Sequence, residues 1–480
     1  MAEANTPLIV VWFRQDLRLA DHPALSAAVA AGAPVLPVFV LDESGDWAPG
    51  GASRWWLHGS LAALDADLRA RGSRLLLRRG PALDVLPRLL AEAGAGGLYF
   101  SRHYEPQQAA SESRLAAMLA ADGKDCRRFA GSLLFEPEAI RTRAGEPFRV
   151  FTPFYKACLA ANEIRAPLPA PDSVPAPASW PVGERLEDWG LRPSAPDWAA
   201  GLRACWQPGS SGARARLDGF LADVAADYAV ARDRPDRAGT SKLSPHLHFG
   251  ELSPRQVWQR STFDSDAGRG GEGTQAFLRQ VIWREFCYHL LHHWPEIDAK
   301  PFNPGFAGFP WRDDPAALAA WQGGRTGYPI VDAGMRQLWQ TGWMHNRVRM
   351  VVASFLTKHL LLPWQAGADW FWDTLVDADL ANNAAGWQWV AGCGADAAPY
   401  FRIFNPVLQG RKFDPDGSYV RRWVPELAEV PTRIVHAPWE AGAEVPGYPA
   451  PIVEHRHARQ RALDAYAVLK RRSMAAPAPL

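Results

Sequence analysis

The sequence predicts an N-terminal α/β domain, built on a parallel five-stranded doubly wound sheet, and a C-terminal all-α domain. Three observations lead to this fold class. The 480 residues exceed what one hydrophobic core usually holds. Short apolar runs alternate with helical patterns in the first part, and only helical patterns follow in the last. We therefore expect an α/β domain over residues 1–135, an interdomain linker over 136–206 and a helical domain over 207–480.

The predicted sheet consists of five buried strands with helices between them. One helix is expected from Asp21, with Pro23 in its first turn, and others from Ser53, from Pro81 and near Gln107. Because strands and helices alternate, the strands should run parallel, with helices on both faces and a ligand at the carboxyl ends of the strands. The expected strands cover residues 8–13, 34–41, 74–78, 97–101 and 125–129.

The segment after the first strand argues against an ordinary NAD-binding domain. A dinucleotide-binding fold would place a glycine fingerprint there, but the sequence has Arg14, Gln15 and Asp16. The glycine cluster at residues 94–97 precedes a strand instead of following one. We therefore interpret that cluster as a loop.

The linker and the helical domain differ in composition. Residues 166–181 are rich in proline and alanine, which indicates a connector with little regular structure. Beyond Ala213, helices are expected at residues 274–293, 331–340, 345–361 and 370–375, without credible strands.

The overall composition is that of an ordinary globular protein. Hydrophobic residues make up 48% and charged residues 21%, no apolar run is long enough to span a bilayer, and residues 1–7 lack the features of a secretory signal. We expect a cytoplasmic protein, a monomer, with no membrane partner. The net charge of +1 does not indicate a general polyanion binder, but it allows a local basic patch. The five cysteines are far apart, so we expect reduced, mostly buried thiols and no metal site.

One candidate site combines hydroxyl groups with a cation just before a helix. Thr240, Ser241 and Ser244 flank Lys242, and Tyr228 lies a short way upstream. Hydroxyls, backbone N–H groups and a helix N-terminus together can bind a phosphate. Taken alone, the segment is explained more simply by a capping box.

A second candidate lies on a helix whose polar residues interrupt an apolar stretch. Asn346, Arg349 and Met350 share one face through their spacing of three and four residues. Asp377 follows in another apolar segment, and because a buried arginine needs a partner, we expect Arg349 to pair with Asp377. Such a pair could line a site or simply hold two helices together.

The 22 tryptophans exceed what the packing of one or two cores usually needs. Trp311, Trp364 and Trp387 lie in three separate segments that could converge in space. An indole can lose one electron, so a row of them at contact distance can conduct an electron to a buried acceptor. The alternative for each single tryptophan is core packing.

Aromatic residues beside arginines form the last candidate. Gln280 and Trp283 share a helical face, and Trp389 lies two residues after Trp387. Aromatic platforms next to cations suit a flipped, stacked base with a bound phosphate backbone. The arginines in question could instead be solvated surface charges: Arg232, Arg284, Arg347 and Arg402.

In this order, the motifs resemble those of the DNA photolyase and cryptochrome family over nearly the full length of the chain. The family's fold, an α/β domain followed by an all-α FAD-binding domain, agrees with the elements expected above. The matching segments are residues 12–18, 240–245, 282–286, 327–335, 342–349 and 377–389.

The resemblance implies an FAD in the helical domain that is active in its reduced form. Asn383 would face N5 of the flavin, and Trp387, Trp364 and Trp311 would conduct electrons between the flavin and the surface. The other cofactor-binding residues that the resemblance implies are Tyr228, Thr240, Ser241, Lys242, Leu243, Ser244, Gln280, Arg284, Asn346, Arg349, Asp377 and Asp379.

The resemblance also implies a lyase that acts on ultraviolet-damaged DNA. Family members that repair (6-4) photoproducts carry a second histidine after the one matching His345, whereas this chain has Asn346. Met350 fits a pocket for a cyclobutane pyrimidine dimer, in which Trp283 and Trp389 would hold the flipped dimer. We therefore expect light-driven dimer repair by electron transfer from the reduced flavin, with Arg232, Arg284, Arg347 and Arg402 on the DNA.

Three features keep the subclass and the antenna open. Dimer-repairing members commonly have a glutamate where this chain has Gln280, and an amide can hydrogen-bond but cannot protonate the dimer. Residues 244–251 resemble members close to plant cryptochromes, so a blue-light photoreceptor is the alternative function. Glu105 resembles the carboxylate that holds a folate antenna in relatives, so methenyltetrahydrofolate is expected ahead of a deazaflavin.

Overall fold

The computed structural model describes residues 7–161, 164–266, 271–397, 401–442 and 444–475, with the backbone alone at 264–266 and 472–475. The chain divides into two compact units. Unit 1 comprises Met1–Phe148, Thr152–Ala226 and Ser241–Pro295. Unit 2 comprises Arg149–Phe151, Asp227–Thr240 and Glu296–Leu480.

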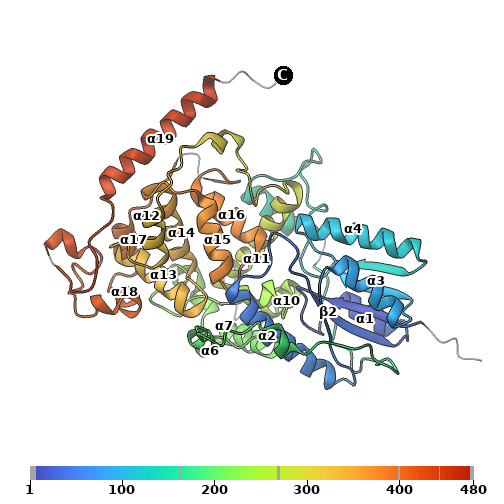
Figure 1. The fold of residues 1–480 in the computed structure, drawn as a ribbon. Helices are drawn as coiled ribbons and strands as arrows, with labels where there is room; N and C mark the ends of the chain where they lie inside the picture. Colours follow the sequence, from blue (N-terminus) through green and yellow to red (C-terminus); the bar gives the residue numbers. More distant parts are fainter. Residues whose placement is uncertain (1–6, 162–163, 267–270, 398–400, 443, 476–480) are drawn as a thin grey trace, which may run out of the picture. The chain divides into compact units, whose positions relative to one another are not determined.

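Unit 1 contains a parallel sheet with the strand order β3-β2-β1-β4-β5 (Figure 1). Val11 of β1 lies opposite Pro37 of β2 and Tyr99 of β4, so the strand order reverses at β1. This confirms the predicted doubly wound sheet. The prediction that β5 is buried is wrong: Asp125 and Arg128 are exposed, because β5 forms an edge of the sheet. The strands are β1 (Ile9–Phe13), β2 (Val35–Leu41), β3 (Leu76–Arg79), β4 (Gly97–Ser101) and β5 (Asp125–Phe129).

Helices cover both faces of this sheet. On one face, Val10, Leu36 and Leu98 pack against α3 (Ala82–Glu92) and α4 (Pro106–Ala121) in one buried cluster. Helix α1 (Pro23–Ala30) contacts β1, β4 and β5 but contributes no residue to that cluster, which places it on the other face. Helix α2 (Gly51–Arg69) lies between β2 and β3 in the chain, near the expected Ser53.

Helix α1 begins two residues later than predicted because Asp21 has another partner. The N-cap is His22, whose Nδ1 accepts a hydrogen bond from the Leu25 N–H at 3.1 Å. Asp21 instead accepts a hydrogen bond from Arg255 Nε at 2.9 Å, and both side chains are buried.

The linker has more regular structure than the sequence predicts. It contains α5 (Phe151–Ala160), a short 3-10 helix (Leu186–Trp189) and α6 (Ala200–Cys205). Phe154 of α5 is buried, with its ring centroid 5.2 Å from that of Phe286, so packing stabilises this helix. Residues 166–181 form no helix or strand, as predicted.

Four helices that follow the linker group with the sheet in unit 1: α7 (Ser210–Asp223), α9 (Ser244–His248), α10 (Pro254–Asp266) and α11 (Glu272–His293). Buried arginines make this connection. Arg18 donates to the Gly250 carbonyl at 2.8 Å, and Arg255 binds Asp21. Because these partners are more than 200 residues apart, the sequence pattern marks only the change to helical chain at residue 207 and not this grouping.

Unit 2 consists of helices and loops, without a strand among its described residues. Helix α15 begins at Trp364, directly after Pro363 at its N-cap, and not at Trp370 as the sequence suggested. A π-helical turn (Phe355–His359) continues α14 and completes the helix expected at 345–361. The helices are α8 (Tyr228–Ala231), α12 (Pro315–Gln322), α13 (Pro329–Thr341), α14 (Asn346–Ser354), α15 (Trp364–Thr374), α16 (Leu380–Ala391), α17 (Pro406–Phe413), α18 (Ser418–Trp423) and α19 (His455–Ala475).

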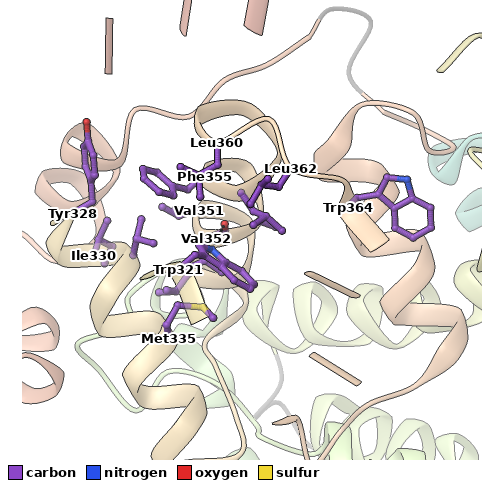
Figure 2. Packing of buried hydrophobic residues seen from close by; sticks show 14 of the residues in the cluster. Trp321, Tyr328, Ile330, Met335, Val351, Val352, Phe355, Leu360, Leu362 and Trp364 are labelled. Carbon is purple, nitrogen blue, oxygen red and sulfur yellow. Dashed lines mark hydrogen bonds between the residues drawn. The ribbon is translucent and has the colours of Figure 1, made fainter. Parts of the chain in front are cut away.

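The core of unit 2 lies around Trp321 (Figure 2). This side chain is fully buried, and its Nε1 donates a hydrogen bond to the Val352 carbonyl at 3.0 Å. Met335, Phe355 and Trp364 belong to the same hydrophobic cluster. The cluster therefore joins α12, α13, α14 and α15 into one packed body.

No helix in the described part of the chain is both long and apolar enough to cross a membrane. None of the five cysteines forms a disulfide, but fewer are buried than expected: Cys158 and Cys393 are buried, Cys126 and Cys287 are half-buried, and Cys205 is exposed at the end of the short helix α6. The described residues contain no group of three or more His, Cys, Asp or Glu side chains that could hold a metal ion.

Candidate functional site

The contact between α15 and α16 positions the central tryptophan of the candidate site. Trp387 of α16 is buried, and its indole lies directly on Gly367 of α15. A Cβ atom at residue 367 would lie 2.1 Å from Cη2 of Trp387, a distance that excludes any side chain there. Trp364 lies three residues before Gly367 on α15 and belongs to the same buried cluster as Trp387.

Asn383 lies one helical turn before Trp387 on α16. Its Nδ2 donates a hydrogen bond to the Ala368 carbonyl of α15 at 3.0 Å. Because a carbonyl oxygen can only accept, the amide nitrogen must face Ala368, and Oδ1 is left to accept from another group. Asn383 is half-buried, so that oxygen can serve a ligand.

The predicted pairing of Arg349 with Asp377 is confirmed. Arg349 Nη2 lies 2.9 and 3.1 Å from the two carboxylate oxygens of Asp377, and Arg349 Nε donates to the Met344 carbonyl at 2.8 Å. Asp377 is buried and Arg349 half-buried. The pair therefore presents a partly accessible guanidinium whose orientation is set by its partners.

Asp379 and His345 both cap helices, a role that the sequence pattern did not reveal. Asp379 accepts hydrogen bonds from the N–H and from Nδ2 of Asn382, at 3.0 and 2.6 Å, at the start of α16. His345 Nδ1 accepts from the Arg347 N–H at 3.2 Å at the start of α14. Burial lowers the pKa of His345 to about 4, so the ring is neutral at pH 7. Asn346, the first residue of α14, is exposed.

One hydrophobic cluster brings together the three tryptophans of the predicted electron path. Trp364 and Trp387 are buried members of this cluster, and the half-buried Trp311 packs against it. The Trp311 ring centroid lies 4.3 Å from that of Phe309. Trp389 is half-buried as well, and its Nε1 donates to the Asp396 carbonyl at 3.0 Å.

Helix α11 of unit 1 presents Gln280 and Trp283, three residues apart and both half-buried. Gln280 Nε2 donates to the Ala276 carbonyl of its own helix at 3.4 Å. Arg284 has a contact that the sequence did not predict, because its Nη1 donates a hydrogen bond to the Ser132 carbonyl at 3.1 Å.

The predicted phosphate segment begins with Thr240 and Ser241, both half-buried. The N-cap of α9 is Leu243, which makes no side-chain capping bond, so a capping box does not account for these hydroxyls. Lys242 is half-buried with a left-handed φ of 51°, and Ser244 is exposed. Upstream in unit 2, Tyr228 is buried, and burial raises its pKa.

Three predicted residues remain, Arg232, Arg402 and Glu105. The half-buried Arg232 has its guanidinium 5.7 Å from the Tyr228 ring centroid. Arg402 is exposed. Glu105 is buried at the N-cap of α4, where its side chain makes no capping bond.

The contact between Gly367 and Trp387 predicts that a side chain at residue 367 destabilises the protein, and a second glycine, Gly386, provides the control. Gly367→Ala would force the Trp387 indole to move, so we expect a loss of about 1–3 kcal/mol of stability from overpacking. Gly386→Ala on α16 meets no atom within 4 Å and should raise stability slightly through its helix propensity. Urea unfolding of both variants measures the difference, and equal stability of the two would contradict the packing described above.

Comparison with known proteins identifies the family. Residues 9–173 match the model of DNA photolyase, and residues 277–468 match that of the FAD binding domain of DNA photolyase. The chain is 50% identical to the deoxyribodipyrimidine photo-lyase of Agrobacterium fabrum, over 97% of this chain and 99% of the relative. It is 40% identical to cryptochrome-1 of Arabidopsis thaliana, over 94% of this chain and 69% of the relative.

A solved structure extends the agreement to three dimensions. The crystal structure of a bacterial class III photolyase from Agrobacterium tumefaciens matches with a TM-score of 0.94 and 49% identity, covering 98% of this chain and 100% of the other. Both units are thus matched by one relative along its whole length. The chain belongs to the DNA photolyase and cryptochrome family.

Proposed function

We propose that this protein is a deoxyribodipyrimidine photo-lyase that uses light and reduced FAD to split cyclobutane pyrimidine dimers in ultraviolet-damaged DNA. The observation that carries the proposal is the α15–α16 contact, which places an oriented amide, Asn383, and a buried indole, Trp387, on one face of α16. Both of these groups suit a flavin. The amide oxygen can accept a hydrogen bond from the ring, and the indole can supply an electron.

The residues present fit an FAD. Asn383 Oδ1 is left to accept, the guanidinium of Arg349 is held by Asp377, and the hydroxyls of Thr240 and Ser241 suit a phosphate. When bound and reduced, FAD supplies the photochemistry, donating one electron to the dimer and recovering it after the ring opens. The protein's part is to bind, orient and exclude water.

Trp387, Trp364 and Trp311 would deliver electrons that bring the flavin to its reduced state. Their common hydrophobic cluster supports this assignment, because indoles held in a packed core change position little when they gain or lose charge. Trp311 is half-buried and so can exchange electrons with a reductant in solution.

Trp283 and Trp389 would stack on the flipped dimer, and Met350 and Gln280 would also contact it. Half-buried indoles support this role, because they offer an exposed face on which a base can stack. Four arginines would contact the DNA backbone: Arg232, Arg284, Arg347 and Arg402.

Since repair requires access to cellular DNA, we also propose a cytoplasmic location, with the protein acting as a monomer.

We propose a folate antenna, methenyltetrahydrofolate before a deazaflavin. Glu105 supports it, because a buried carboxylate can accept hydrogen bonds from the N–H groups of a pterin. The pigment released from the purified protein by denaturation should show a pterin absorption band in addition to FAD. A deazaflavin spectrum in the released pigment would refute the folate assignment.

The repair function is tested on an oligonucleotide containing one thymine dimer. Illumination of the chemically reduced protein should restore the absorbance of thymine, and no recovery by a protein that holds FAD would favour a photoreceptor instead.

Trp387→Phe should slow photoreduction of oxidised flavin by about ten-fold or more, since 1.4 kcal/mol of added barrier has that effect. The same variant should still repair the dimer after chemical reduction.

Replacing Gln280 with glutamate is predicted to increase the repair activity. A glutamic acid can protonate the dimer radical anion, so we expect Gln280→Glu to raise the repair rate by about two- to ten-fold, the range given by one additional net hydrogen bond. The gain should vanish as pH rises through the pKa of the new carboxyl group, because the carboxylate has no proton to donate.

The matched control for this prediction is Gln275→Glu, an exposed position on the same helix. It adds the same charge to α11 and should leave the repair rate unchanged. Equal rates for Gln280→Glu and the parent protein at low pH would refute the role assigned to residue 280.

A further inference from the structure

Arg347, which the proposed function places on the DNA backbone, is already paired. Its Nη2 donates to Asp233 Oδ1 at 2.8 Å, and its guanidinium carbon lies 4.4 Å from the Phe413 ring centroid. Nη1 lies 3.9 Å from Met350 Sδ. The buried Nε has no hydrogen-bond partner among the residues that the structure describes. The guanidinium is therefore oriented on two sides, and its Nε–H is not used by any residue that the structure describes.

Asp233 is more exposed than its partner, with 37% of its side chain accessible against 21% for Arg347. It follows α8 in a short segment that carries three arginines, Arg232, Arg234 and Arg237. Arg234 has its own carboxylate partner, because its Nη2 lies 2.6 Å from Asp236. The Asp233 carboxylate is thus used on Arg347 and is not required by its neighbour.

Carboxylate and phosphate groups bind a guanidinium in the same planar geometry. A partly exposed ion pair is also weak, since water competes for both groups. We propose that Asp233 is an intramolecular counter-ion that occupies Arg347 in the free protein and is exchanged for a DNA phosphate when a lesion binds. This inference rests on the proposed function and assigns a specificity-determining role to a residue outside the dimer pocket.

The exchange has two consequences. In the free protein, Asp233 and Phe413 keep Arg347 oriented beside Met350, so the phosphate meets a preorganised cation. In the complex, the released Asp233 carboxylate stands near the phosphate and repels it. Asp233 thereby lowers the affinity for DNA and favours release once the phosphate leaves Arg347.

Asp233→Asn tests the proposal, because asparagine keeps the shape of the side chain and removes its charge. We expect the dissociation constant for a thymine-dimer oligonucleotide, measured by fluorescence anisotropy in the dark, to fall by about three- to five-fold, the range of a surface ion pair. The plot of the logarithm of the association constant against the logarithm of salt concentration should become steeper by about one unit. In the variant, Arg347 no longer has to give up Asp233 when it binds the phosphate, so this contact contributes fully to the release of salt ions.

Two further variants distinguish this mechanism from a general change in charge. Asp236→Asn removes the same charge from the same segment but leaves Arg347 paired, so it should not reproduce the change in salt slope. In an Arg347→Gln background, Asp233→Asn should have no effect on affinity. Equal effects of the two aspartate variants, or an Asp233→Asn effect that persists without Arg347, would overturn the proposal.

The outcome also separates this inference from the proposed function. If the parent protein binds the dimer oligonucleotide and the Asp233→Asn variant binds it equally or more weakly, the counter-ion role of Asp233 is wrong. The proposed repair function still stands in that case. If the parent protein does not prefer the dimer oligonucleotide to an undamaged one, the proposed function fails and the inference fails with it.

Discussion

The close approach of α15 and α16 at Gly367 is the constraint on which the site in unit 2 depends. Without a Cβ at this position, the Trp387 indole can lie on the backbone of α15. The same approach brings the Asn383 amide to the Ala368 carbonyl and so determines which amide atom is left for a ligand. One missing methyl group therefore positions the Trp387 indole and the Asn383 amide together, because both residues lie on the same face of α16.

Buried charges, each with a partner, determine how distant segments are joined. In unit 1, Arg255 binds Asp21 and Arg18 binds the Gly250 carbonyl, which connects a helical segment to the loops at the carboxyl edge of the sheet. In unit 2, Arg349 and Asp377 make an equivalent connection between α14 and the segment before α16. An unpaired charge would be costly in these positions, so each pair selects one arrangement of the chain.

Several polar residues serve the fold and, in our proposal, the ligand as well. Asp379 caps α16, Arg284 holds the Ser132 carbonyl, and Arg347 is oriented by Asp233 and Phe413. Such contacts reduce the freedom of side chains before anything binds, which lowers the entropic cost of binding. The hydrophobic cluster that Figure 2 shows in part acts in the same direction, because Trp364 is one of its buried members and burial limits the movement of a side chain.

The sequence by itself determined the two fold classes, the strand positions and the pairing of Arg349 with Asp377, because periodicity and the need to neutralise a buried charge are local or chemically specific signals. Only the tertiary structure showed that β5 is an exposed edge, that Pro363 starts α15, and that residues 241–295 group with the sheet. It alone also revealed the Gly367 contact and the Asp233–Arg347 pair. These features depend on which distant residues meet in space, and no spacing along the chain encodes that.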